Sequence, residues 1–81
     1  MNNEKLLSRI TVDPKILVGK PTIRGLRISV EQILLSLAAG IDIKSILEEY
    51  PDLEWDDIKA VFAYTASLVA EEQIYPVEMK Q

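Results

Sequence analysis

The chain has 81 residues, of which 48% are hydrophobic and 27% are charged, a composition typical of one small folded domain and not of a disordered segment. It has no cysteine and no histidine, which excludes disulfides, zinc sites built from thiolates or imidazoles, and catalysis by histidine or cysteine. The net charge of −4 is uneven, because six bases and two acids give 6 − 2 = +4 in residues 1–27, whereas three bases and eleven acids give 3 − 11 = −8 in residues 28–81. A basic front and an acidic back indicate two surfaces with different partners, or a solvated surface that is merely uneven.

The chain shows no internal repeat, so we expect a single domain over residues 9–72, between an N-terminal extension (1–8) and a C-terminal tail (73–81). Within the domain, residues 9–29 form a basic segment of short strands and residues 30–72 form a three-helix core. No stretch approaches the roughly twenty apolar residues of a membrane-spanning helix, and the N-terminus lacks the apolar run of a signal peptide. A cytoplasmic protein is therefore expected.

The first predicted elements are a strand and a short helical turn. Residues 9–13 alternate between apolar and polar, as in a half-buried strand, with Ile10 and Val12 on one face. Asp13, followed by a proline, is typical of a helix start. Only a single turn fits before Gly19, whose missing Cβ suits a left-handed stop.

The next segment, residues 22–29, predicts a small hairpin. Its turn is placed at Gly25-Leu26, because glycine at the first central position suits a type II′ turn, which needs a positive φ there. The resulting register has two cross-strand pairs: Ile23 with Ile28, and Arg24 with Arg27.

The basic residues of this segment are candidate contacts for an anion. Like charges on opposite strands destabilise a hairpin unless an anion lies between them. Lys20, Arg24 and Arg27 are therefore candidates to bind a nucleic-acid phosphate or an acidic patch on a partner protein. The alternative is that each arginine pairs with one of the carboxylates of this chain.

Three helices are predicted after the hairpin. Ser29, with a glutamine three residues later, forms a capping box for the first, which ends at Gly40. Asp42 caps the second helix, and Pro51 ends it, because the residue before a proline is disfavoured in a helix. The third helix runs from about residue 54 to about residue 72.

The glycine between the first two helices gives the layout of a helix-turn-helix, although many three-helix domains share it. Reading bases requires Arg, Lys, Asn or Gln on the exposed face of a helix. The second helix instead exposes Glu48 and Glu49, and the third begins with several acids. Carboxylates repel phosphates, so neither helix is expected to read the major groove.

The third helix has no charged residue between Lys59 and Glu71, although a surface helix normally has a polar face. One of its two apolar seams is explained by the core of the domain, and its residues are Trp55, Ile58, Phe62, Thr65 and Val69. The second seam, Val61, Tyr64 and Leu68, is predicted to contact a second copy of the chain or another protein. Packing within the core is the alternative for these residues too.

Carboxylates gather near the start of the third helix, at Asp52, Glu54, Asp56 and Asp57. Paired acids can bind Mg²⁺ or act in hydrolysis, but acids in the first turn are also stabilised by the helix dipole, which is the preferred interpretation. Because the chain also lacks a convincing nucleophile, we expect neither an enzyme nor a bound metal or cofactor.

Several stretches together match a known pattern: Ile10–Pro14, Gly19–Ile28, Gly40 with Ile46–Pro51, and Asp57–Tyr64. In these stretches the chain resembles the domain of unknown function 433 family, and the match runs from about Arg9 to about Leu68. The Gly-Lys-Pro string and the Tyr-Pro-x-Leu turn are specific in combination, whereas either alone would be weak.

The resemblance implies a homeodomain-like three-helix fold and a bacterial or archaeal origin. It also implies a role as an antitoxin of the VapB type, partnered with a PIN-like nuclease toxin. The family has no agreed catalytic residues, so none is transferred to this chain. Glu54 stands where relatives usually have a Thr or Ser cap, and Leu26 where they favour Thr.

Three functions are therefore weighed. The first is an antitoxin-like module that binds a PIN-like nuclease through helical and acidic surfaces and forms a homo-oligomer. The second is a DNA-binding transcriptional regulator that uses Lys20, Arg24 and Arg27. The third is a structural or adaptor dimer that binds no nucleic acid.

Overall fold

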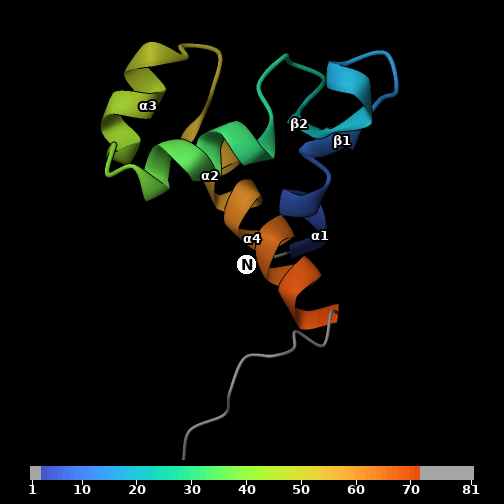
Figure 1. The fold of residues 1–81 in the computed structure, drawn as a ribbon. Coiled ribbons are helices and arrows are strands. Elements are labelled where there is room, and N and C mark those ends of the chain that lie inside the picture. Colours follow the sequence, from blue (N-terminus) through green and yellow to red (C-terminus); the bar gives the residue numbers. More distant parts are fainter. Residues whose placement is uncertain (1–2, 72–81) are drawn as a thin grey trace, which may run out of the picture.

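The computed structural model describes residues 3–71, which are mainly helical and include one short two-stranded sheet (Figure 1). The elements in chain order are α1 (Asn3–Leu7), β1 (Ile10–Val12), the 3-10 helix η1 (Leu17–Gly19), β2 (Pro21–Ile23), α2 (Val30–Ala38), α3 (Ile43–Glu49) and α4 (Trp55–Glu71). The predicted class, mainly helical with short strands ahead of the long helices, is confirmed. The predicted tail, residues 73–81, lies outside the described residues.

The sheet is an antiparallel pair of β1 and β2, with Ile10 opposite Ile23 and Thr11 opposite Thr22. The predicted strand over residues 9–13 is confirmed by β1. Val12, the last residue of β1, was predicted to share a half-buried face with Ile10, but its side chain is exposed. A single bridge joins Thr22 to Ser29 on the other side of β2.

The connection between the strands contains a turn instead of a helix at Asp13. The Asp13 carboxylate accepts a hydrogen bond of 2.9 Å from the backbone N–H of Lys15, which fixes a local turn. The 3-10 helix follows, and Leu17, Val18 and Gly19 all have positive φ, at 49°, 57° and 79°. The left-handed conformation that was predicted for Gly19 therefore already begins at Leu17.

The pairing of Ile23 with Ile28 is confirmed, but the turn lies one residue earlier than predicted and makes Arg24 one of its central residues. Ile23 donates its backbone N–H to the carbonyl of Ile28 at 3.0 Å, as the register requires. The turn closes by a 2.7 Å bond from the N–H of Leu26 to the carbonyl of Ile23, so Arg24 and Gly25 are its central residues, with φ of 46° and 73°. Positive φ at both centres is the type I′ pattern, and a type II′ turn at Gly25-Leu26 is wrong.

The helix ends follow their local signals. Ser29 caps α2 by accepting the N–H of Gln32 at 2.9 Å, and Asp42 caps α3 by accepting the N–H of Ser45 at 2.7 Å. Gly40, with φ of 91°, ends α2 as predicted. The residue after it, Ile41, donates back to the carbonyl of Ser36 at 3.1 Å, which is the Schellman arrangement that a glycine at this position permits.

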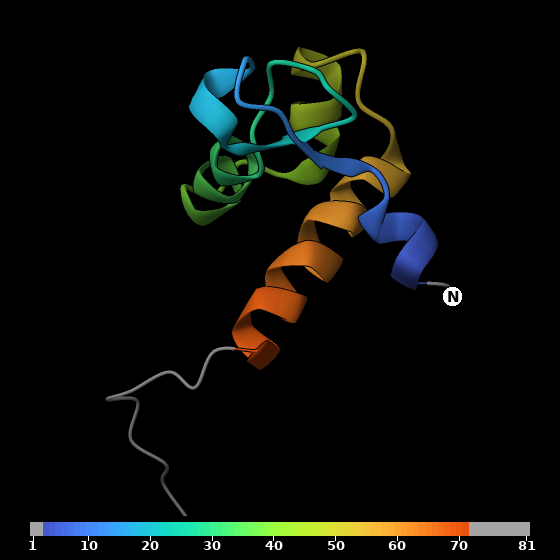
Figure 2. The same ribbon diagram turned by 90° about the vertical axis from the view of Figure 1, so that its right-hand side faces the viewer.

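The core lies where β2, α2 and α3 meet the first half of α4. Its buried apolar side chains are Ile23, Val30, Ile33, Ile46, Leu53, Ile58, Ala60 and Val61. No side chain from residue 62 to residue 71 is buried. The second half of α4 accordingly runs past the other elements, with α1 packed beside the helix (Figure 2).

Among the helices of residues 3–71, none combines the length and the apolar character needed to cross a membrane.

Candidate interaction surfaces

A buried carboxylate connects the start of α4 to the N-terminal segment. Asp57 is the third residue of α4, and its side chain is 0% exposed. Its Oδ2 accepts the backbone N–H of Glu54 at 2.8 Å, which satisfies a free donor at the helix start. The acids of this turn were predicted to stabilise the start of the helix. Asp57 does so by capping the helix with its side chain.

Two arginines from the N-terminal segment also bind this carboxylate. Arg24 donates from Nε to Oδ1 and from Nη2 to Oδ2, both at 2.9 Å, and Arg9 donates from Nη1 to Oδ1 at 3.0 Å. With the N–H of Glu54, each oxygen of Asp57 accepts two hydrogen bonds. The carboxylate is therefore fully satisfied although it is buried.

These contacts keep Asp57 ionised. Burial alone would raise the pKa of Asp57, but hydrogen bonds from Arg24, from the backbone of Glu54 and from Arg9 outweigh burial and lower the pKa below its usual value. A carboxylate held in this form is a poor proton donor at neutral pH. The cluster is therefore suited to join Arg9, which directly precedes β1, to the hairpin turn and α4, and not to general acid catalysis.

On the exposed side of this cluster, the two arginines also contact other acceptors of the chain. Arg9 also contacts the carboxylate of Glu54 at 2.8 Å and approaches that of Asp56 at 3.7 Å. The same Nη2 of Arg24 that binds Asp57 also donates to the backbone carbonyl of Asp52 at 2.6 Å. Nη1 of Arg9 and the Nε and Nη2 of Arg24 therefore donate to acceptors of this chain, which is the alternative that the sequence left open for Arg24.

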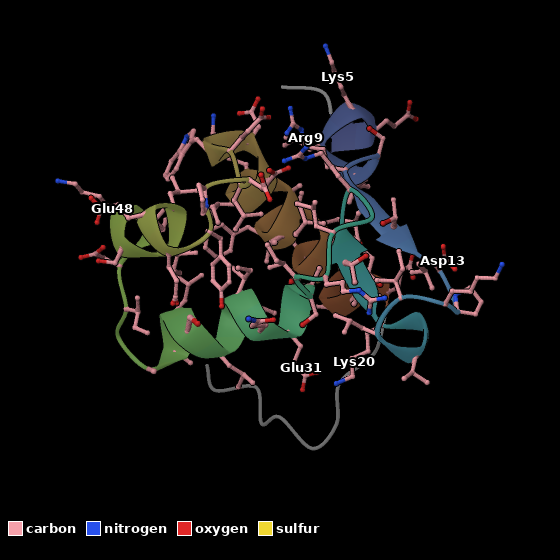
Figure 3. All side chains as sticks on the ribbon, turned by 90° about the horizontal axis from the view of Figure 1, so that it is seen from above. Lys5, Arg9, Asp13, Lys20, Glu31 and Glu48 are labelled. Atoms are coloured by element: carbon pink, nitrogen blue, oxygen red, sulfur yellow. The ribbon has the colours of Figure 1, made fainter. Side chains whose placement is uncertain are left out.

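The predicted anion contacts are not brought together. Lys20 points away from the arginine cluster and forms an ion pair of 2.7 Å with Glu31 on α2 (Figure 3). The hydrogen bond and the charge of Lys20 lower the pKa of Glu31. Arg27 is exposed and forms no ion pair with another residue of the range 3–71. Arg24 and Arg27 do not face each other across an empty anion site, because the turn directs Arg24 to Asp57.

The predicted partner seam on α4 divides into buried and exposed residues. Val61 is 0% exposed and packs in the core, so its side chain cannot contact a partner, and this part of the prediction is corrected. Tyr64 is half-buried against the same core. Leu68 is 42% exposed and lies in the second half of α4, where no side chain is buried. The second seam is therefore the inward side of the helix.

The outward side of α4 is also apolar. Trp55, Phe62 and Val69 are 51%, 47% and 54% exposed, respectively. These residues were predicted to form the seam that the core covers, and only Ile58 of that seam is buried. The free apolar surface of α4 thus lies on a different side from the predicted one.

An apolar hollow of about 400 Å³ lies between α3 and the start of α4. Its lining residues are Ile43, Lys44, Leu47, Glu48 and Trp55. The hollow exists because Pro51 ends α3 and the chain turns back before α4, which sets Trp55 beside the outer face of α3. Over residues 3–71 no group of acids is arranged to hold a metal ion.

Two features of these surfaces escaped the sequence analysis. The burial of Asp57 was missed, although an acid at the third position of a helix whose cap is glutamate is a local sign of reciprocal capping. The pairing of Arg9 with that acid was missed as well, and no local pattern announces a contact between residues 48 positions apart.

Comparisons with known proteins give two matches. A family model described as "Protein of unknown function (DUF433)" matches residues 10–65. An uncharacterized protein of Sinorhizobium fredii (strain NBRC 101917 / NGR234), y4eO, is 36% identical over 55 residues, which cover 68% of this chain and 25% of that protein. The chain thus spans about a quarter of the length of this relative. No solved structure matches the chain.

Proposed function

The chain belongs to the DUF433 family, and on that premise we propose that it is a non-catalytic, antitoxin-like module that binds a PIN-like nuclease toxin in the cytoplasm. The family description assigns no function, so the proposal rests on the resemblance to antitoxins and on the surfaces of this chain. We also propose that α2, α3 and α4 correspond to the three helices of a homeodomain-like core, because Gly40 and Asp42 form a helix-turn-helix bend between the first two.

The observation that carries the proposal is the apolar hollow beside Trp55 and the acids around it. Residues 43–57 hold one base and six acids, so 1 − 6 = −5. Asp57 and Glu54 are paired with arginines, whereas Glu48, Glu49 and Asp52 form no ion pair with another residue of the range 3–71. The hollow is thus apolar and lies in an acidic segment, and its own lining carries one acid, Glu48, and one base, Lys44.

A nuclease is a suitable partner for this surface. An enzyme that binds nucleic acid needs bases to contact the phosphates, and an acidic protein surface can occupy such a basic face in place of the substrate. The apolar hollow, with its tryptophan, supplies the kind of central contact that dominates the binding energy of protein interfaces. Occupying the basic face would inhibit the nuclease.

The non-catalytic part of the proposal follows from composition and pairing. The chain has no histidine and no cysteine, and Asp57, its buried carboxylate, is held ionised by two arginines. DNA binding by the basic segment is disfavoured as the main function, because Lys20 and Arg24 are paired with Glu31 and Asp57. A phosphate would have to displace those carboxylates.

The first test is to purify the tagged protein from its native cells and to identify bound proteins by mass spectrometry. We expect a PIN-like nuclease in a stoichiometric amount and no nucleic acid, judged by absorbance at about 260 against about 280 nm. Nucleic acid without a nuclease would favour the DNA-binding regulator. A homo-oligomer that carries neither would favour the adaptor dimer.

The second test measures the affinity of the purified pair. Glu48→Lys reverses a charge at the hollow and should weaken binding by about tenfold. Glu71→Lys makes the same change at the far end of α4 and should leave the affinity unchanged. Equal affinities for the two variants would show that the nuclease binds elsewhere.

A further inference from the structure

The outward side of α4 has the spacing of a helix-pairing seam. Trp55, Lys59, Phe62, Ala66 and Val69 follow one another at alternating steps of four and three residues. In an α-helix such residues form one strip, as positions a and d do in a coiled coil. The buried apolar side chains of α4, Ile58, Ala60 and Val61, lie on other sides of the helix, and the second half of α4 runs past the core (Figure 2).

This strip is unusually apolar for a solvent-facing helix surface. Phe62 and Val69 are each about half exposed, and Ala66 between them is exposed. Residues 60–70 contain no charged side chain, so the apolar side chains of the strip in this range are in direct contact with water. A helix that is apolar on its outer face is normally covered by another element, and no element of residues 3–71 covers this one.

We propose that the strip is covered by α4 of a second copy of the chain, packed antiparallel about a two-fold axis that passes between Phe62 and Ala66. In that arrangement the Phe62 ring of each copy lies in the space above Ala66 of the other, as a large knob in a shallow hole. Lys59 of each copy lies beside Val69 of the other, where its aliphatic stem packs and its ammonium stays in water.

The order of residue sizes and charges favours an antiparallel pair over a parallel one. A parallel pair would set Phe62 against Phe62 and would leave a gap between the two Ala66 positions. It would also bring the two Lys59 ammoniums together, which is repulsive. In the antiparallel pair the two Lys59 residues are about 15 Å apart along the axis, which exceeds the Debye length of about 10 Å at 0.1 M salt. The helix dipoles then also oppose each other favourably.

A second copy fits this strip better than the nuclease does. The strip offers no carboxylate to a basic surface, whereas the hollow beside Glu48 does. An isologous contact, in contrast, requires only a surface that complements itself. The strip also differs from the predicted interface residues Val61, Tyr64 and Leu68, which lie on the inward side. The strip shares only Trp55 with the hollow, and Trp55 lies outside the Lys59–Val69 span that pairs in the dimer, so the dimer and the nuclease site have separate tests.

The test of the dimer compares the mass of the full chain in solution with that of two variants. Ala66→Glu places a carboxylate in the centre of the strip with a residue that favours helix, and Ala39→Glu adds the same group at an exposed position of the α2 end. We expect a wild-type dimer at micromolar concentrations, an unchanged Ala39→Glu dimer, and a dissociation constant raised at least about hundredfold in Ala66→Glu. Circular dichroism checks that both variants stay helical.

Cross-linking tests the direction of packing, because the chain has no cysteine of its own. An oxidised mixture of Lys59→Cys and Val69→Cys proteins should give a disulfide-linked pair containing one of each, identified by intact mass. Neither variant alone should cross-link, since its two copies are too far apart for a disulfide. Cross-linking of Lys59→Cys alone would overturn the antiparallel arrangement.

Two further results would overturn the dimer itself. One is a monomeric wild-type chain at about 100 μM, well above the affinity expected for such a contact. The other is a dimer that Ala66→Glu leaves intact. If Ala66→Glu instead abolishes binding of the nuclease, and the wild-type chain without nuclease is monomeric, the strip is the nuclease site and the proposed dimer is rejected. A Glu48→Lys chain that loses the nuclease but stays dimeric would leave this inference standing and confine the nuclease to the hollow.

Discussion

Arg24 and Asp57 face each other in a two-pronged ion pair, with both N–H···O distances at 2.9 Å, between residues 33 positions apart in the chain. The pair joins the centre of the hairpin turn to the first turn of α4. It also accounts for the turn type, because Arg24 adopts a positive φ of 46° that a side chain normally disfavours. The bidentate pair and the carbonyl of Asp52 compensate for that conformation.

The first prediction concerns the buried carboxylate. Asp57→Asn should lower the free energy of unfolding by about 3 kcal/mol, because it leaves two arginines facing a neutral amide at a buried position. Asp56→Asn removes an exposed carboxylate whose ion pairs are 3.7 and 3.9 Å long, so it should cost at most about 0.5 kcal/mol. Urea unfolding of both variants measures the difference. Equal decreases in unfolding free energy would mean that the buried ion pairs of Asp57 do not stabilise the fold.

The second prediction concerns pH. The pKa of Asp57 is lower in the folded chain than its ordinary value of 3.8, so the stability it contributes is complete above that value and is lost as the pH falls through the folded pKa. Asp42 and Glu31, whose pKa values are also lowered, act in the same direction. The gap in unfolding free energy between the wild type and Asp57→Asn should therefore narrow as the pH falls from 3.8 through the folded pKa. A gap that stays constant over this range would contradict an ionised Asp57.

The third prediction separates the two arginines of the hairpin, for which the sequence indicated one shared anion site. Arg24→Ala should cost about 2–4 kcal/mol, because it leaves Asp57 with fewer partners in a buried site. Arg27→Ala should change stability by less than about 0.5 kcal/mol, since Arg27 is exposed. Thermal unfolding measures both. Two equally stable variants would restore the interpretation of the pair as a free anion contact.

The elements that the sequence predicted well are those whose signals are local. Ser29, Gly40 and Asp42 each act on a backbone group within four residues, so the ends of α2 and α3 could be assigned from neighbouring residues alone. The register of Ile23 with Ile28 was predictable for the same reason. The turn type was not, because a distant partner, Asp57, stabilises the left-handed conformation of Arg24.

The candidate surfaces were harder to predict than the fold. On α4 both sides are apolar, so the helical period shows two seams but not which of them faces the core. Val61 and Phe62 are neighbours of similar hydrophobicity, yet Val61 is buried and Phe62 is 47% exposed. The choice between them depends on where β2, α2 and α3 approach the helix. Those are long-range contacts that no spacing in a single sequence reveals.

The fourth prediction tests the hairpin turn. A Cβ added at Gly25 would meet no atom within 4 Å, but the φ of 73° is disfavoured for residues with side chains. Gly25→Val should therefore cost about 1–2 kcal/mol through backbone strain alone. Gly25→Asn should cost clearly less, because asparagine tolerates the left-handed region. If both variants unfold at the wild-type temperature, the positive φ at this residue is wrong.

The fifth prediction distinguishes the two ends of the inward side of α4. Because the predicted partner seam contains Val61 and Leu68, it implies that an aspartate at either residue dissociates an oligomer. The structure gives the two changes different outcomes. Val61→Asp buries an unpaired charge in the core, and a penalty above about 4 kcal/mol approaches the whole stability of so small a domain. We therefore expect Val61→Asp to be unfolded or insoluble at any concentration.

Leu68→Asp should fold, because Leu68 is 42% exposed and its new carboxylate reaches water. It should also stay dimeric, since residues 62 and 68 point in directions about 120° apart around a helix. Circular dichroism establishes the fold, and sedimentation establishes the mass. A folded, monomeric Leu68→Asp would move the dimer contact from the strip through Phe62 to the inward edge of α4, and a folded Val61→Asp would show that the core does not close around that residue.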